Sequence, residues 1–262
     1  MCENKELKFG SGNRTSKHHG KLTLLLGLLF VIGSCLLICG CSSESVDDQF
    51  ISSLEKGLSA RWAKMDDTDE SKSYYEGVVN AELDEVSKYS EESFEDEDLG
   101  KLAKEYIELL NSSLKTLDYY GNDSKLVSEW NKVKDDRVAC LVKINEIKPL
   151  EFSSDSDQEE WESLLSEGKV VQSIRKIMKA AKFKVTEDDG YGKTCVAMIE
   201  NTSDEEFDYF DLEYKLLDKD GNTLESSYAS TSNWKPGEKA KFEFWTDENF
   251  KEIKVTSCEY NY

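Results

Sequence analysis

The sequence predicts an α+β chain of several domains: an N-terminal signal helix, an antiparallel helical bundle and a small antiparallel β-sandwich. Three observations predict this order. A stretch of twenty uncharged, mostly apolar residues follows a basic leader. A long middle region then carries apolar side chains at intervals of three or four residues, the period of an α-helix. In the last part apolar residues alternate with polar ones, the period of a β-strand. The predicted domains are residues 1–41, 42–182 and 183–262.

Charge is distributed unevenly along the 262 residues, whose formal net charge is −21. Residues 1–21 carry five basic and two acidic side chains, whereas residues 42–262 carry 28 basic and 52 acidic ones. A body this acidic repels phosphate backbones, so we predict that it does not bind nucleic acid. Its 38% apolar and 11% aromatic content predicts a folded body rather than a disordered one.

Histidine occurs only in the leader, at His18 and His19. The body therefore has no imidazole to act as a general base or as a metal ligand. This excludes Ser-His and Cys-His nucleophilic sites and His-ligated metal sites. No other motif selects catalytic, metal-ligating or cofactor-binding residues, so we predict none of these and no cofactor.

The apolar segment Leu22–Cys41 has the pattern of a secretory signal, with a basic start, an apolar centre and a small-residue exit. Its end, Ile-Cys-Gly-Cys at residues 38–41 followed by two serines, resembles the lipobox of bacterial lipoproteins. The resemblance implies that Cys41 is lipidated and anchors the body to the outer face of the bacterial cytoplasmic membrane. A second candidate, Cys35, is disfavoured because it leaves an apolar run on the mature end. An uncleaved transmembrane anchor stays open, because twenty apolar residues also span a bilayer.

Five amphipathic helices are predicted in the middle region, and their short connections favour an antiparallel bundle. Ser45 with Asp48 predicts a capping box at the first helix, and Ser156 with Glu159 predicts one at the fifth. The apolar stripes cover residues 50–65, 75–86, 102–117, 126–144 and 161–177.

Two features of the helical region have an alternative interpretation as binding sites. Trp62, Trp130 and Trp161 could form a ligand-stacking set, but all three lie on apolar stripes, so we predict that they belong to the core. The acidic residues between 91 and 98 could bind a hard cation. Their carboxylates lack a regular ligand spacing, so a solvated loop or a helix start is predicted instead.

About six strands with regular turn signals are predicted after residue 183, which indicates a small antiparallel β-sandwich. In the clearest strand Phe210, Leu212, Tyr214 and Leu216 alternate with more polar neighbours. Asp218, Asp220 and Asn222 have some of the spacing of a calcium loop. The glycine stands fourth instead of sixth and no glutamate follows at the twelfth position, so a hairpin turn is predicted. The other predicted strands are residues 194–200, 223–228, 239–244 and 253–260.

The strand Tyr-Lys-Leu-Leu-Asp at residues 214–218, followed by Lys-Asp-Gly-Asn, resembles the motif of the FxLYD domain family. Residues 200–203 and 236–238 fit the same pattern, with Tyr214 at the family's Phe and Leu217 at its Tyr. The resemblance covers roughly the last 80 residues. It implies an immunoglobulin-like sandwich, common at the C-terminus of secreted and lipid-anchored bacterial proteins, and it says nothing about catalysis.

Cys195 and Cys258 lie in the first clear strand and the last one. Export from the cytoplasm permits a disulfide, and a bridge between sheets would suit a small core. Two buried thiols are the equal alternative, because two cysteines in a sequence do not define their geometry. Cys140, among apolar neighbours, is predicted to be a buried residue rather than a nucleophile.

These observations together predict a surface-exposed, lipid-anchored binding or interaction module on the extracellular side of the membrane. Its predicted partners are the membrane, through the lipid, and a protein, peptide or cell-wall component. A structural spacer of the envelope is one alternative. A hydrolase of wall glycans that uses a carboxylate pair is the other, less favoured one.

Overall fold

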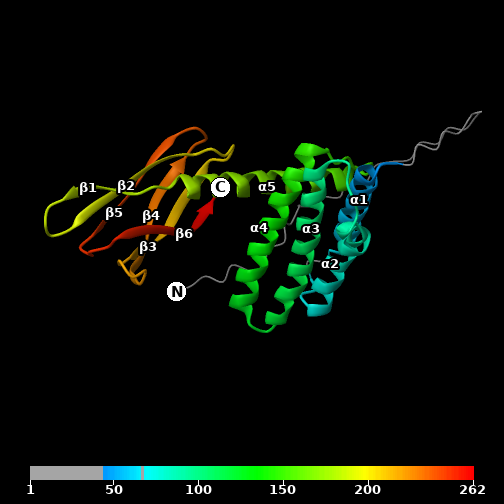
Figure 1. Cartoon of the computed structure of the whole chain (residues 1–262), viewed down its shortest axis with the longest axis horizontal. Helices are drawn as coiled ribbons and strands as arrows, with labels where there is room; N and C mark the ends of the chain where they lie inside the picture. The colour runs from blue at the N-terminus through cyan, green and yellow to red at the C-terminus, as the bar shows by residue number, and fades with distance from the viewer. Residues whose placement is uncertain (1–43, 66–67) are drawn as a thin grey trace, which may run out of the picture.

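The computed structural model describes residues 44–65 and 68–262, and it has the mixed α+β composition predicted (Figure 1). The leader, including Cys41, lies outside the described residues. The helices are α1 (Val46–Lys64), α2 (Lys72–Val86), α3 (Glu97–Thr116), α4 (Asp123–Ile147) and α5 (Asp155–Ala180). The strands are β1 (Lys184–Asp188), β2 (Lys193–Glu200), β3 (Phe207–Leu217), β4 (Thr223–Trp234), β5 (Lys239–Thr246) and β6 (Glu252–Asn261). Within the described ranges, no helix is both long and apolar enough to cross a bilayer.

The two predicted capping boxes have different outcomes. Ser45 caps α1 as predicted, since its Oγ accepts the N–H of Asp48 at 3.0 Å. The prediction for α5 is wrong, because Ser156 already lies inside the helix and Ser154, at the N-cap position, makes no side-chain capping hydrogen bond. Gln158 Oε1 instead accepts the backbone N–H of Phe152 at 3.3 Å, which ties the first turn to the preceding chain.

The acidic residues from 91 to 98 form an exposed loop followed by a helix start, in agreement with the prediction of a loop or a helix start. Asp96 caps α3 by accepting the backbone N–H groups of Asp98 and Leu99, each at 2.9 Å. Asp47, buried in the first turn of α1, accepts the N–H groups of Glu95 and Asp96 at 2.9 and 3.0 Å. Carboxylates at both sites compensate backbone donors that a helix start leaves without partners.

The strands form two antiparallel sheets, in the orders β1-β2-β5 and β4-β3-β6. The predicted alternation in β3 is confirmed, since Phe210, Leu212, Tyr214 and Leu216 are all buried. The hairpin after β3 is also confirmed. Asp218 Oδ1 accepts the N–H groups two and four residues later at 2.8 and 2.9 Å, and Gly221 adopts φ +83°. The alternation of apolar and polar residues does not predict β1, because all five residues of this strand are exposed.

Helix α5 belongs to two cores. Its Trp161 packs in the core of the helical part, with Phe50, Leu54 and Tyr106 among others. Its later residues Val170, Ile174 and Ile177, with Ala181 just after the helix, pack in the core that the two sheets share. Figure 1 shows α5 passing from the other helices to the strands. One continuous helix therefore connects the helical part to the sheets through apolar contacts at both of its ends.

Cys195 and Cys258 are both free thiols in the structure, so the candidate bridge between them is not formed. Cys195 is fully buried in β2. The Sγ of Cys258 lies 3.6 Å from the Sδ of Met178, so this side chain contributes to the contact between β6 and α5. Burial raises the pKa of the Cys258 thiol to about 12. Cys140 is buried as predicted, and burial raises the pKa of its thiol to about 12 as well.

Candidate functional site

A cavity of about 370 Å³ lies in the helical part, lined by residues of all five helices. This volume is within the range of small-ligand pockets, which are mostly apolar with a few polar groups. The apolar lining includes Trp62, Tyr74, Tyr75, Val78, Trp130 and Leu164. We call this cavity with its lining the helical pocket.

Aromatic rings form most of its apolar wall. The Tyr75 ring packs at 5.4 Å from that of Trp130 and 5.3 Å from that of Tyr74. Trp62, at the end of α1, lies in the lining and contacts the ring of Phe152 at 5.2 Å. Trp130 and Trp161 are buried as predicted, whereas Trp62 is only partly buried. The core prediction is therefore confirmed for Trp130 and Trp161, although Trp130 also lines the pocket together with Trp62.

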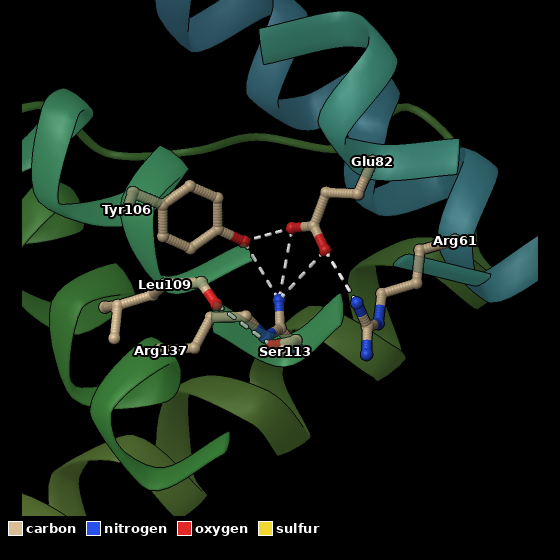
Figure 2. A network of polar contacts seen from close by, with 6 residues as sticks. All are labelled: Arg61, Glu82, Tyr106, Leu109, Ser113 and Arg137. Atoms are coloured by element: carbon tan, nitrogen blue, oxygen red, sulfur yellow. Dashed lines mark hydrogen bonds and ion pairs between the residues drawn. The ribbon is translucent and has the colours of Figure 1, made fainter. Parts of the chain in front are cut away.

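A network of buried charges adjoins the pocket, with one residue from each of four helices (Figure 2). Its centre is Glu82 of α2, whose side chain is 0% exposed. Glu82 Oε2 accepts a hydrogen bond from Arg61 Nη1 of α1 at 3.0 Å. The Nη1 of Arg137, on α4, lies 3.1 and 3.2 Å from the two oxygens of the same carboxylate. The hydroxyl of Tyr106, on α3, donates to Glu82 Oε1 and accepts from Arg137 Nη1 at 2.9 Å.

One carboxylate is thus the ion-pair partner of two guanidinium groups. Burial raises the pKa of Tyr106 well above its ordinary value, so the phenol is neutral and adds no negative charge. Burial is the largest single influence on Arg137 and disfavours its charged form, but the combined interactions with Glu82 and Tyr106 outweigh burial and raise the pKa of Arg137. For Arg61, burial and then the neighbouring Arg137 lower the pKa. Arginine nevertheless keeps its charge in proteins, so this network carries one positive charge more than it has negative charges.

This network was not predicted from the sequence, although two features of the sequence indicate it. Glu82 stands three residues after Val79 and four before Val86, in the middle of an apolar stripe. The chain has four arginines against 29 lysines, and two of the three arginines after residue 41 are in the network. Arginine suits buried ion pairs better than lysine does, because its planar guanidinium is more weakly hydrated. An acidic or arginine side chain within an apolar stripe of a helix is the feature that indicates such a buried network.

The acidic residues of the lining do not form an opposed pair. Glu167 is held by Lys134 at 2.6 Å, and both side chains are about one third exposed. Glu159 and Glu160 are exposed and adjacent on α5, so they point about 100° apart around the helix. Glycoside hydrolysis uses two carboxyl groups that face one bond from opposite sides. Within residues 44–65 and 68–262, no group of three or more His, Cys, Asp or Glu side chains is placed to hold a metal ion.

The cysteines predicted as site residues that the structure describes do not line the helical pocket, whereas Trp62 and Trp130, which were weighed as part of a ligand-stacking set, do. Cys41 lies outside the described residues, and Cys195 and Cys258 are in the strands. The pocket instead combines an aromatic wall with the buried guanidinium groups of Arg61 and Arg137. Such an arrangement can bind and orient a small molecule. A scan against protein-family models and a search of curated proteins find no match to this chain.

Proposed function

We propose that the protein is a lipid-anchored bacterial envelope protein that binds a small ligand in its helical part and catalyses no reaction. The helical pocket carries this proposal: a cavity of about 370 Å³ with aromatic walls and the side chain of Arg61, which is 8% exposed. A spacer needs no such cavity, and packing such rings over a buried ion network without a void would be more stable. The ligand is a small molecule or the end of a peptide from the envelope.

The proposed localisation of the protein rests on the sequence of its first 43 residues. The basic start, the apolar segment and the Gly-Cys-Ser-Ser ending support lipidation at Cys41 and a body on the extracellular side. For the C-terminal part we propose an immunoglobulin-like FxLYD sandwich. Its support is the motif at residues 214–222 together with two three-stranded antiparallel sheets over a common core.

Blocking the mouth of the pocket tests the binding proposal. Ser163 is exposed and lines the pocket from α5, so Ser163→Trp should fill part of it and weaken binding of a neutral aromatic probe, indole-3-acetamide, by about tenfold or more. Ligand-observed NMR on the full-length chain in detergent measures this. The control is Ser166→Trp, an exposed position of α5 outside the lining, which should bind like the unmodified chain. Equal binding by both variants, or no binding by the unmodified chain, would contradict a pocket function.

The anchor has its own test in bacterial cells supplied with radiolabelled palmitate. The full-length chain should incorporate the label, and Cys41→Ser should lose it, because the thioether forms on that sulfur. Cys39→Ser, two residues away, is the matched control and should keep the label. Label that persists in Cys41→Ser and disappears in Cys35→Ser would move the lipidation site. An unlabelled chain that stays in the membrane would instead support the transmembrane anchor.

A further inference from the structure

In the part of the chain that the structure describes, only one nitrogen of the Arg61 guanidinium has a hydrogen-bond acceptor. Arg61 is more than nine-tenths buried, and among residues 44–65 and 68–262 the sole acceptor for its guanidinium is Glu82, which binds Nη1. Its Nε and Nη2 form the edge on which arginine binds a carboxylate through two parallel hydrogen bonds. Arg61 is part of the pocket lining, and no described residue accepts a hydrogen bond from this edge.

The charges around the pocket favour an anion at this position. The adjoining network holds Arg61 and Arg137 against the single carboxylate of Glu82, with the phenol of Tyr106 uncharged. A negative ligand group would balance the excess positive charge where water is largely excluded and electrostatic attraction is strong. Lys134 adds no excess charge, because Glu167 pairs with it.

The remaining acidic residues of the lining do not cancel this preference. Glu159 and Glu160 are exposed, so water and salt screen their repulsion of a ligand. Arg61 and Arg137 are buried, and screening there is much weaker. A ligand that enters with its negative group first therefore passes exposed carboxylates, whose repulsion is screened, and then reaches buried guanidinium groups, whose attraction is screened much less.

The aromatic walls and the volume of the helical pocket indicate the chemistry and the size of the rest of the ligand. Rings of Trp62, Tyr74 and Trp130 line the space beside Arg61, and flat aromatic faces pack well against such rings. The volume of about 370 Å³ admits a molecule of one or two fused rings.

From this juxtaposition we propose that the helical pocket binds a small aromatic carboxylate, whose carboxylate pairs with the Nε–Nη2 edge of Arg61 and whose ring lies between the tryptophans and tyrosines. The proposal rests on the proposed function, and it adds the chemical class of the ligand and the residue that selects it.

A pair of isosteric probes tests it: indole-3-acetate, which is an anion at neutral pH, and its neutral amide, indole-3-acetamide. The full-length chain should bind the anion about tenfold or more tightly than the amide, since a charge-assisted pair replaces a neutral hydrogen bond. In Arg61→Gln this preference should fall to within about twofold. Arg175→Gln should retain it, because Arg175 lies outside the pocket and pairs with Asp136 at 2.5 Å.

A second variant keeps the test decisive if Arg61→Gln folds poorly. Arg61→Lys retains the positive charge but has no two-nitrogen edge, so its preference for the anion should be intermediate. Far-UV circular dichroism of each variant establishes that the helices are intact. If the unmodified chain binds anion and amide equally, and Ser163→Trp abolishes both, the carboxylate proposal fails and the binding function stands. If neither probe binds the unmodified chain, both proposals fail.

Discussion

Glu82→Gln should lower the free energy of unfolding by about 3–5 kcal/mol, the largest effect that we expect from any single substitution in the helical part. The change removes the one carboxylate of the described residues that bonds both Arg61 and Arg137, both of them buried. Two guanidinium groups would then remain close together in the interior without the carboxylate that pairs with both. Their mutual repulsion and their lost hydration have no compensation in the variant. Urea denaturation followed by far-UV circular dichroism measures the loss.

Two further variants show whether charge is the cause. Asp84→Asn removes an exposed carboxylate from the same helix and should change the free energy of unfolding by no more than about 0.5 kcal/mol. Adding Arg61→Gln to Glu82→Gln removes one of the unbalanced cations. The double variant should therefore be more stable than the sum of the two single losses predicts, by about 1 kcal/mol or more. A loss below about 1 kcal/mol for Glu82→Gln itself would show that the network is not held by this carboxylate.

Gly168→Ala should destabilise the protein by about 1–3 kcal/mol, although alanine is the better helix former by about 1 kcal/mol. Gly168 is buried in α5 against α4. A Cβ at this position would stand 2.5 Å from Val142 Cγ2 and 2.7 Å from the carbonyl oxygen of Val138. The second atom belongs to the backbone and cannot rotate away, so the two helices would have to move apart. Urea denaturation gives the change in the free energy of unfolding.

Gly77 provides the matched control for this steric argument. It is also in the interior of a helix, α2, but a Cβ there would have no atom within 4 Å. Gly77→Ala should therefore stabilise the protein by about 0.5–1 kcal/mol, the ordinary gain in helix propensity. Opposite signs for the two glycines would confirm the close approach of α4 and α5. A gain in stability for Gly168→Ala would mean that these helices lie farther apart than described.

Local features of this protein could be predicted from the sequence because each depends on a few neighbouring residues. The cap of α1 needs only Ser45 and the N–H of Asp48, and the turn after β3 needs only Asp218 and the residues that follow it. The burial of alternate residues in β3 follows from the two-residue repeat of a strand. The lipidation of Cys41 also rests on a local pattern, and it stays a prediction.

The helical pocket and the charged network beside it could not be predicted from the sequence, because they depend on the tertiary structure. Arg61, Glu82, Tyr106 and Arg137 come from four different helices, and periodicity assigns each to a helix face without saying which faces meet. The same holds for Trp62, whose stripe position fits both a core and a pocket wall.

The sequence by itself determined the order of helices and strands and the acidic character of the body, because periodicity and composition are properties of the chain alone. Only the tertiary structure decided that α5 joins both cores and that a pocket beside a buried network with one excess positive charge lies inside an acidic protein. The physical reason is that burial changes the strength of a charge. The exposed carboxylates are screened by water and salt, whereas the few guanidinium groups that packing encloses keep most of their attraction.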